Sequence, residues 1–217
     1  MIWRFRDRHD AGRQLAARLE AYAGRNDVVV LALPRGGVPV GYEVANALGA
    51  PLDVLTVRKL GVPGQTELAM GAIASGGATF LNEDVIAVKH VTDDALRKVE
   101  KRERAELERR EKLYRGTRLP LEIHGKTVIL VDDGIATGAS MRAAVMALRS
   151  RLPARLVIAV PVAPADAVAA LEQTADELVC ALTSVEFFAV GQFYRDFDPT
   201  TDVDVRRLLD EARKVPV

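Results

Sequence analysis

The segment VILVDDGIATGAS, residues 128–140, decides the fold. It opens with an apolar run without polar alternation, which is typical of a strand covered on both faces of a parallel sheet. Two adjacent acids, Asp132 and Asp133, follow that run, and a turn of small residues leads from them into a predicted helix over 139–148. Because ligands of such sheets bind beyond the carboxyl ends of the strands, this order predicts a binding loop after the strand.

Strand and helix patterns repeat on both sides of this segment. Strands that alternate with helices predict an α/β fold with a doubly wound, mostly parallel sheet. The glycine-rich stretch 61–77 has no clean period and predicts a long loop that contains a short strand or two. The other predicted strands are 28–33, 52–57, 156–162 and 178–182, and the other predicted helices are 10–23, 92–114, 165–174, 202–212 and one ending at Gly49.

Charge and composition exclude several classes of protein. Thirty Lys and Arg balance thirty Asp and Glu among 217 residues, so the formal net charge of zero argues against a nucleic-acid partner bound by bulk charge. The only cysteine, Cys180, excludes a disulfide framework and a Cys-based zinc cluster. The charged N-terminal residues do not resemble a signal peptide, and no apolar run reaches ~20 residues. We therefore expect a cytoplasmic protein without a membrane partner.

The turn after the two acids has the composition of a phosphate-binding cup. Ala136, Gly138 and Ala139 are small enough for backbone N–H groups to point into one concavity, and Thr137 and Ser140 add hydroxyl donors. The preceding carboxylates repel a phosphate but can accept hydrogen bonds from sugar hydroxyls or hold Mg²⁺ through water. The segment therefore predicts a site for a sugar phosphate, against the alternative of an ordinary capped turn.

Two other phosphate-binding motifs do not fit the sequence. A Walker-B reading of the acids needs a Walker-A loop, but Gly125-Lys126-Thr127 precedes a strand, and Pro120 stands where the first glycine belongs. The segment 36–41 has Val38 at the second glycine that the dinucleotide fingerprint requires.

Cations follow two other predicted strands. Arg35 offers a planar fork of donors, and Gly36 and Gly37 allow close backbone approach, although a tight turn is the simpler explanation. Arg58 and Lys59 come directly after the predicted strand 52–57, where solvated surface charge is the alternative.

Residues 128–140 resemble the phosphoribosyl pyrophosphate (PRPP) binding motif of type I phosphoribosyltransferases. The resemblance implies that Asp132 and Asp133 bind the ribose hydroxyls, with Mg²⁺ held there through water or PRPP. It also implies a 5′-phosphate site made of Ala136, Thr137, Gly138, Ala139 and Ser140.

The same resemblance implies a pyrophosphate site with catalytic roles for its cations. Arg35, Gly36 and Gly37 would bind pyrophosphate together with Arg58 and Lys59. In this family a basic residue of this kind is followed by a mobile lid that keeps water from the reacting ribose.

The lid and a hood complete the implied architecture. Glu67 is the only acid of the lid and would contact substrate or Mg²⁺ as a further catalytic residue. Phe188 could stack on a base and Gln192 could read its edge, although core packing is the alternative for this aromatic segment. A single domain over 1–217 would have its core at about 25–182, a hood at about 1–9 and 183–217, and a flexible loop at about 60–80.

One departure from the family bears on the acceptor. Members that act on 6-oxopurines usually carry an aspartate directly before the Thr-Gly of the motif, where this chain has Ala136. This argues against hypoxanthine or guanine bound in that way and leaves the acceptor open. A group of bacterial proteins with Arg-Gly-Gly, Arg-Lys and a Tyr-x-x-Phe tail, here Tyr194 to Phe197, is similar.

The resemblance thus implies an Mg²⁺-dependent, homodimeric enzyme that transfers the phosphoribosyl group from PRPP to a nitrogen acceptor, with a nucleobase as the expected acceptor. A PRPP-sensing regulator without turnover is the first alternative. A sugar-phosphate hydrolase with Asp132 as the nucleophile is the second. The charged helix 92–114 is either a solvated face or a dimer contact.

Overall fold

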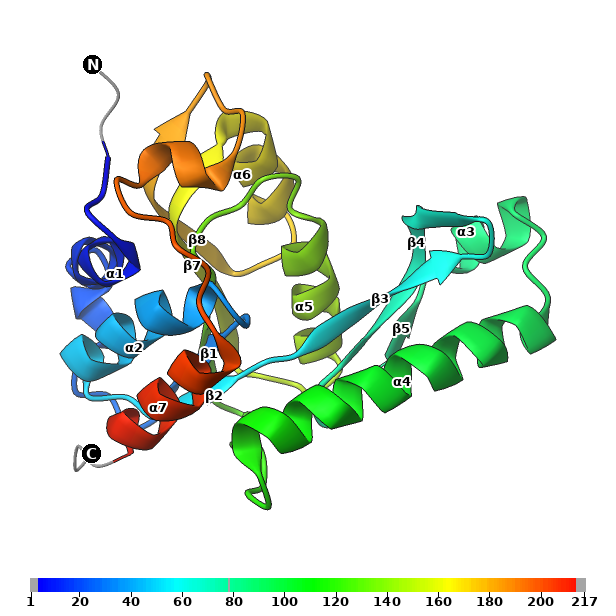
Figure 1. Cartoon of the computed structure of the whole chain (residues 1–217), viewed down its shortest axis with the longest axis horizontal. Coiled ribbons are helices and arrows are strands. Elements are labelled where there is room, and N and C mark those ends of the chain that lie inside the picture. Colours follow the sequence, from blue (N-terminus) through cyan, green and yellow to red (C-terminus); the bar gives the residue numbers. More distant parts are fainter. Residues whose placement is uncertain (1–3, 78, 214–217) are drawn as a thin grey trace. The chain divides into compact units, whose positions relative to one another are not determined.

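The computed structural model describes residues 4–77 and 79–213, which form two compact units (Figure 1). The first unit comprises Met1–Val54, Leu121–Gly138 and Pro153–Val217, and the second comprises Leu55–Pro120 and Ala139–Leu152. Within the described chain, no helix is both long and apolar enough to cross a membrane.

A five-stranded sheet, all of it parallel, forms the centre of the first unit. Figure 1 places helices on both of its faces, with α1, α2 and α7 grouped on one face and α6 on the other. The strands, in the order β2-β1-β6-β7-β8, are β2 (Leu52–Val54), β1 (Val28–Ala32), β6 (Thr127–Val131), β7 (Arg155–Pro164) and β8 (Glu177–Ser184). The helices are α1 (Arg8–Ala16), α2 (Gly37–Leu48), α6 (Ala165–Glu172) and α7 (Asp202–Ala212), with short 3₁₀ turns η1 (Glu20–Tyr22) and η2 (Val190–Phe193).

This architecture confirms the predicted doubly wound α/β fold. Every residue of β1 and β6 is buried, as continuous apolar runs require when both faces of a sheet are covered. Gly49 adopts a left-handed conformation just after α2, and the Thr201 side chain caps α7 by accepting a hydrogen bond from the Asp204 N–H.

The order of the strands places a switch point between β1 and β6. From β1 the chain passes through α2 to β2 on one side, whereas β6, β7 and β8 follow one another on the other side. The two strands pair in parallel from Val28 with Thr127 to Ala32 with Val131, so their carboxyl ends are adjacent. Loops that diverge at such a point leave a crevice in which ligands of α/β proteins bind.

The second unit is built on an antiparallel sheet in the order β3-β4-β5. Leu60, Met70 and Ile73 of this sheet pack with Val99 and Leu107 in one apolar cluster. Its elements are β3 (Val57–Val62), β4 (Gln65–Ala74), β5 (Thr79–Leu81), α3 (Glu83–Val88), α4 (Asp93–Arg115) and α5 (Ala139–Arg149).

The expected long flexible loop at about 60–80 is wrong as a description of local structure. A two-residue turn joins β3 to β4, which pair from Val57 with Ala74 to Val62 with Gln65, and β5 adds a third strand. Close approach between strands explains Gly61, because a Cβ atom there would lie 2.6 Å from the Thr66 carbonyl oxygen, whereas Gly64, Gly76 and Gly77 have positive φ angles.

Two further boundaries differ from the prediction. The expected strand 52–57 divides at Leu55, since β2 joins the parallel sheet and β3 joins the antiparallel one. Arg58 and Lys59 therefore lie inside β3 and do not follow the end of a strand. The first helix ends at Ala16 and not at residue 23, although Leu19 and Tyr22 are buried through the 3₁₀ turn that follows.

Candidate active site

The turn between β1 and α2 is pressed against the two acids that follow β6. A side chain at Gly37 would lie 2.8 Å from the Asp132 Cα atom and 2.9 Å from the Val131 carbonyl oxygen. One at Gly36 would collide with the Asp133 carboxylate. Only residues without a Cβ atom allow this approach. The structure thus brings together two predicted site loops at the switch point of the sheet.

The paired acids have perturbed pKa values. Burial raises the pKa of the Asp132 carboxyl well above its usual range, and the charge of Asp133 raises it further. Burial also raises the pKa of Asp133, although a hydrogen bond from Arg8 opposes this effect. The Asp133 N–H donates to Asp132 Oδ1 at 2.8 Å. Perturbed carboxylates beside a glycine turn are typical of functional sites and make this a candidate, because hydroxyl donors or a cation would stabilise them.

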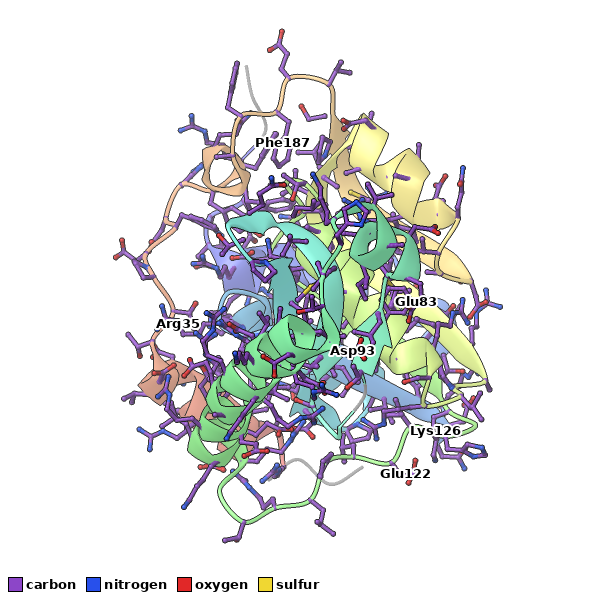
Figure 2. All side chains as sticks on the ribbon, turned by 90° about the vertical axis from the view of Figure 1, so that its right-hand side faces the viewer. Arg35, Glu83, Asp93, Glu122, Lys126 and Phe187 are labelled. Carbon is purple, nitrogen blue, oxygen red and sulfur yellow. The ribbon has the colours of Figure 1, made fainter. Side chains whose placement is uncertain are left out.

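Arg35 stands at the rim of the same turn, where it is labelled in Figure 2. Its side chain is about half exposed (52%), and its Nη1 atom lies 3.8 Å from Asp202 Oδ1. The Pro34–Arg35 peptide bond is cis. A loose, exposed ion pair contributes little stability, so the Arg35 guanidinium can turn toward a bound anion at small cost.

The turn after the acids is hydrogen-bonded to β7 at its start, and the residues that follow are mostly exposed. The Ile135 N–H donates to the Val162 carbonyl oxygen at 2.9 Å, and Ile135 itself is buried. Ala136, Thr137 and Ser140 are exposed, as a cup that admits a phosphate requires. Of the five predicted phosphate residues, Ala136, Thr137 and Gly138 belong to the first unit, and Ala139 and Ser140 begin α5.

A pocket of about 480 Å³ adjoins this turn in the first unit. Its walls come from three carboxyl-terminal strand ends: the β6 turn, the junction of β7 with α6, and the segment after β8. Asp166 is the only charged side chain among the lining residues. The lining residues are Ala136, Thr137, Pro164, Ala165, Asp166, Ser184, Val185, Phe187 and Phe188.

The predicted base-binding residues have different surroundings. Phe188 lines the pocket and is 92% exposed. Gln192 does not line it, because its Oε1 atom accepts hydrogen bonds from the Phe188 and Ala189 N–H groups and its Nε2 atom donates to the Glu186 carbonyl oxygen. Gln192 therefore shapes the loop that carries Phe188, and this geometry does not favour a base-reading role. Phe187, labelled in Figure 2, packs on Phe193 with ring centroids 5.1 Å apart.

The remaining predicted residues lie in the second unit, and their part in the site stays a prediction. Arg58 donates from Nε to Glu103 Oε2 at 2.8 Å, and the Glu103 side chain is 9% exposed. Burial would raise the pKa of Glu103, but hydrogen bonds from Arg58 and Arg102 bring it below its usual value. Lys59 is the neighbouring half-buried residue of β3. Glu67 belongs to β4, and its side chain lies outside the described part of the structure.

Two contacts to the acids were not foreseen from the sequence. Arg8 donates from Nε to Asp133 Oδ2 at 2.8 Å, and the Tyr194 hydroxyl donates to the Asp133 carbonyl oxygen at 2.5 Å. Both residues come from the segments expected to form a hood, of which residues 1–3 and 214–217 lie outside the described range. The Tyr-x-x-Phe tail was the only available signal, and it gave no indication of what Tyr194 would contact.

Comparison with known proteins agrees with this geometry. A family model described as "Phosphoribosyl transferase domain" matches residues 5–197. Two Mycobacterium tuberculosis proteins, "Putative phosphoribosyl transferase MT0597" and "Putative phosphoribosyl transferase Rv0571c", are each 50% identical over 210 residues, which is 97% of this chain and 47% of theirs. The chain therefore spans about half the length of these curated relatives.

A solved structure extends the similarity to the whole fold. The protein TT1426 from Thermus thermophilus superimposes with a TM-score of 0.87 at 45% sequence identity, covering 96% of this chain and 98% of that one. The family match over most of the chain and the parallel sheet with its acidic loop lead to one assignment. The chain belongs to the phosphoribosyl transferase domain family and has the α/β fold of type I phosphoribosyltransferases.

Proposed function

We propose that this chain transfers the 5-phosphoribosyl group from PRPP to a nitrogen acceptor, with a nucleobase as the acceptor class, and releases pyrophosphate. The observation that carries the proposal is the contact of the Gly36–Gly37 turn with Asp132 and Asp133 at the switch point of the sheet. The turn, which is suited to pyrophosphate, therefore lies beside two carboxylates that are suited to hydrogen bonds from a sugar diol.

Different residues would bind the three parts of PRPP. Asp132 and Asp133 accept hydrogen bonds from the ribose hydroxyls, and the open turn 136–140 binds the 5′-phosphate through backbone N–H groups and hydroxyls. Arg35 and the N–H groups of its turn bind pyrophosphate. The ribose is thereby fixed at both ends, which holds its anomeric carbon in place against an acceptor.

The acids also fit a magnesium cofactor. Mg²⁺ prefers oxygen ligands and keeps several waters, and two closely packed carboxylates with raised pKa values supply negative charge that a cation would stabilise. Among the described residues, no group of three or more His, Cys, Asp or Glu side chains could enclose a metal ion. Asp132 and Asp133 would therefore hold Mg²⁺ through water or through PRPP. When bound, the ion offsets charge on the departing pyrophosphate.

The reaction needs positioning and electrostatics more than a reactive side chain. Departure of pyrophosphate leaves positive charge on the ribose ring, as in other glycosyl transfers, and carboxylates that hold the ribose hydroxyls would stabilise it. Arg35 offsets the negative charge that grows on the leaving group. The transfer requires no covalent nucleophile, and the family match disfavours the hydrolase reading of Asp132.

The acceptor fits best in the pocket beside the turn. Phe188 offers an exposed aromatic face on which a flat heterocycle can stack. Asp166 would accept hydrogen bonds from N–H groups of the acceptor. With Ala136 in place of an acidic neighbour, Asp166 is the pocket's only charged group for recognising the acceptor.

Turnover is tested by pyrophosphate release from PRPP and Mg²⁺ with a panel of purine and pyrimidine bases. We expect release with at least one base, and weaker release for the Asp166→Asn variant with that base. PRPP binding without release for any base would favour the PRPP-sensing alternative. Absence of PRPP binding would contradict both readings.

Replacing both acids tests the ribose assignment. We expect Asp132→Asn with Asp133→Asn to abolish PRPP binding in calorimetry, because the amides cannot supply the charge that holds the diol and the ion. Glu172→Gln, an exposed change at the end of α6, is the control and should bind as the unaltered chain does. Unchanged binding by the double variant would refute the assignment.

The raised pKa of Asp132 predicts a stabilising substitution. The folded chain retains a proton that the unfolded chain has lost, so stability falls as pH rises from the usual Asp pKa of 3.8 through the raised value. Asp132→Asn removes this cost at pH 7 and keeps an acceptor for the Asp133 N–H. We expect a gain of about 0.5–2 kcal/mol in the free energy of unfolding, measured with urea. A loss of stability would contradict the raised pKa.

Close approach at Gly36 predicts a local effect on binding. Gly36→Ala should push the Asp133 carboxylate aside and weaken PRPP binding about tenfold, equivalent to about 1.4 kcal/mol. The same change in an Asp133→Ala background is the control, since the obstructed side chain is then absent. Equal losses in both backgrounds would show that Gly36 acts through the main chain and not through Asp133.

A further inference from the structure

The Arg8 guanidinium is held by three groups of the first unit. Its Nε atom donates to Asp133 Oδ2 at 2.8 Å, and its Nη1 atom donates to the Asp198 carbonyl oxygen at 2.8 Å. Its Cζ atom lies 3.9 Å from the centroid of the Phe197 ring. The side chain is 11% exposed. A guanidinium held in this way has a fixed orientation, and its hydrogen bond can fix the orientation of the partner carboxylate.

The two terminal segments that supply these groups are paired with each other. The Phe5 N–H donates to the Phe193 carbonyl oxygen at 2.8 Å, and the Arg195 N–H donates to the Phe5 carbonyl oxygen at 2.9 Å. Phe5 and Tyr194 form a parallel bridge, and their rings are 5.6 Å apart. This pairing sets the start of α1, and with it the position of Arg8.

A second contact from the same segments reaches the same acid. The Tyr194 hydroxyl donates to the Asp133 carbonyl oxygen, and the Tyr194 ring packs on Phe197 with centroids 4.9 Å apart. Arg8 thus holds the carboxylate of Asp133 while Tyr194 holds its main chain. The two paired segments thus both contact one residue of the proposed ribose site.

A purely structural role does not account for this choice of partner. Placing an ion pair away from water costs free energy, and the apolar cluster that contains Phe5 and Phe193 would join the terminal segments without it. Arg8 contacts the carboxylate that the proposed function assigns to ribose. The contact uses Oδ2, which leaves acceptor capacity on Oδ1 for a hydroxyl group.

We propose that Arg8 is a positioning residue that aims the Asp133 carboxylate at the ribose diol, so that docking of the paired terminal segments prepares the sugar site. The inference rests on the proposed function, because it needs Asp133 to bind ribose. It adds a residue outside the strand-end loops that acts on substrate only through another side chain.

Binding of three ligands to Arg8→Gln tests the proposal. PRPP and ribose 5-phosphate carry the diol, whereas propyl phosphate carries only the phosphate group. We expect Arg8→Gln to weaken PRPP and ribose 5-phosphate at least tenfold and to leave propyl phosphate within twofold, measured by calorimetry and ³¹P NMR titration. Arg6→Gln, which removes an exposed arginine two residues away, is the matched control and should change none of the three.

A double-mutant cycle separates action through Asp133 from a general effect. In an Asp133→Asn background, we expect Arg8→Gln to cause no further loss of ribose 5-phosphate binding. Additive losses, or equal weakening of propyl phosphate, would overturn the proposal. Arg8→Lys keeps the charge but not the fork of donors, so its affinity for ribose 5-phosphate should lie between those of the unaltered chain and Arg8→Gln. Failure of both Arg8 variants to fold would identify a structural role and also overturn the proposal.

The same experiment distinguishes failure of the proposed function. If the unaltered chain does not bind PRPP, the proposed function fails and the Arg8 inference falls with it. If the unaltered chain binds PRPP and the losses in the cycle are additive, only the Arg8 inference fails.

Discussion

Close contact between two strand-end turns is the constraint on which the site depends. β1 and β6 are neighbours, so the residues after Ala32 and after Val131 meet at one edge of the sheet. Space for this meeting exists only because Gly36 and Gly37 carry no side chains. The parallel pairing thus fixes two chemically different loops beside each other, which is the preorganisation that the proposed binding and transfer both require.

The acids at this edge are held at a cost to stability. Burial and mutual repulsion raise the pKa of Asp132, and burial raises that of Asp133, so the charged form of each is less favourable here than in water. Unfavourable buried charge of this kind is common at sites where a ligand supplies the compensating charge. Arg8 relieves part of it at Asp133 from outside the sheet, and Asp132 receives no comparable contact among the hydrogen bonds of the described residues.

The sequence allowed prediction of the features that depend on local patterns. β6, α7 and the end of α2 lie where apolar runs, caps and Gly49 indicated, and the acids and the glycine turn are in contact, as the doubly wound order implies. The extent of the β3–β4 hairpin was underestimated as a short strand or two in a loop, because a glycine that serves close strand pairing looks the same as a glycine of a loop. The Arg8 contact was missed because it joins residues 125 positions apart, and spacing carries no information about such a pair.

The surroundings of the cations bear on how charge on pyrophosphate is offset. Arg58 is bound to Glu103, whose own pKa is lowered by that contact, so recruiting Arg58 to a ligand would leave a largely buried carboxylate with only Arg102 to compensate it. Recruiting Arg35 has no comparable cost, because its ion pair with Asp202 is long and exposed. Under the proposed function we therefore expect Arg35, on energetic grounds, to be the first cation that contacts the leaving group. The family's use of a basic residue at the β3 position would require either Lys59 or rearrangement of the Arg58–Glu103 pair.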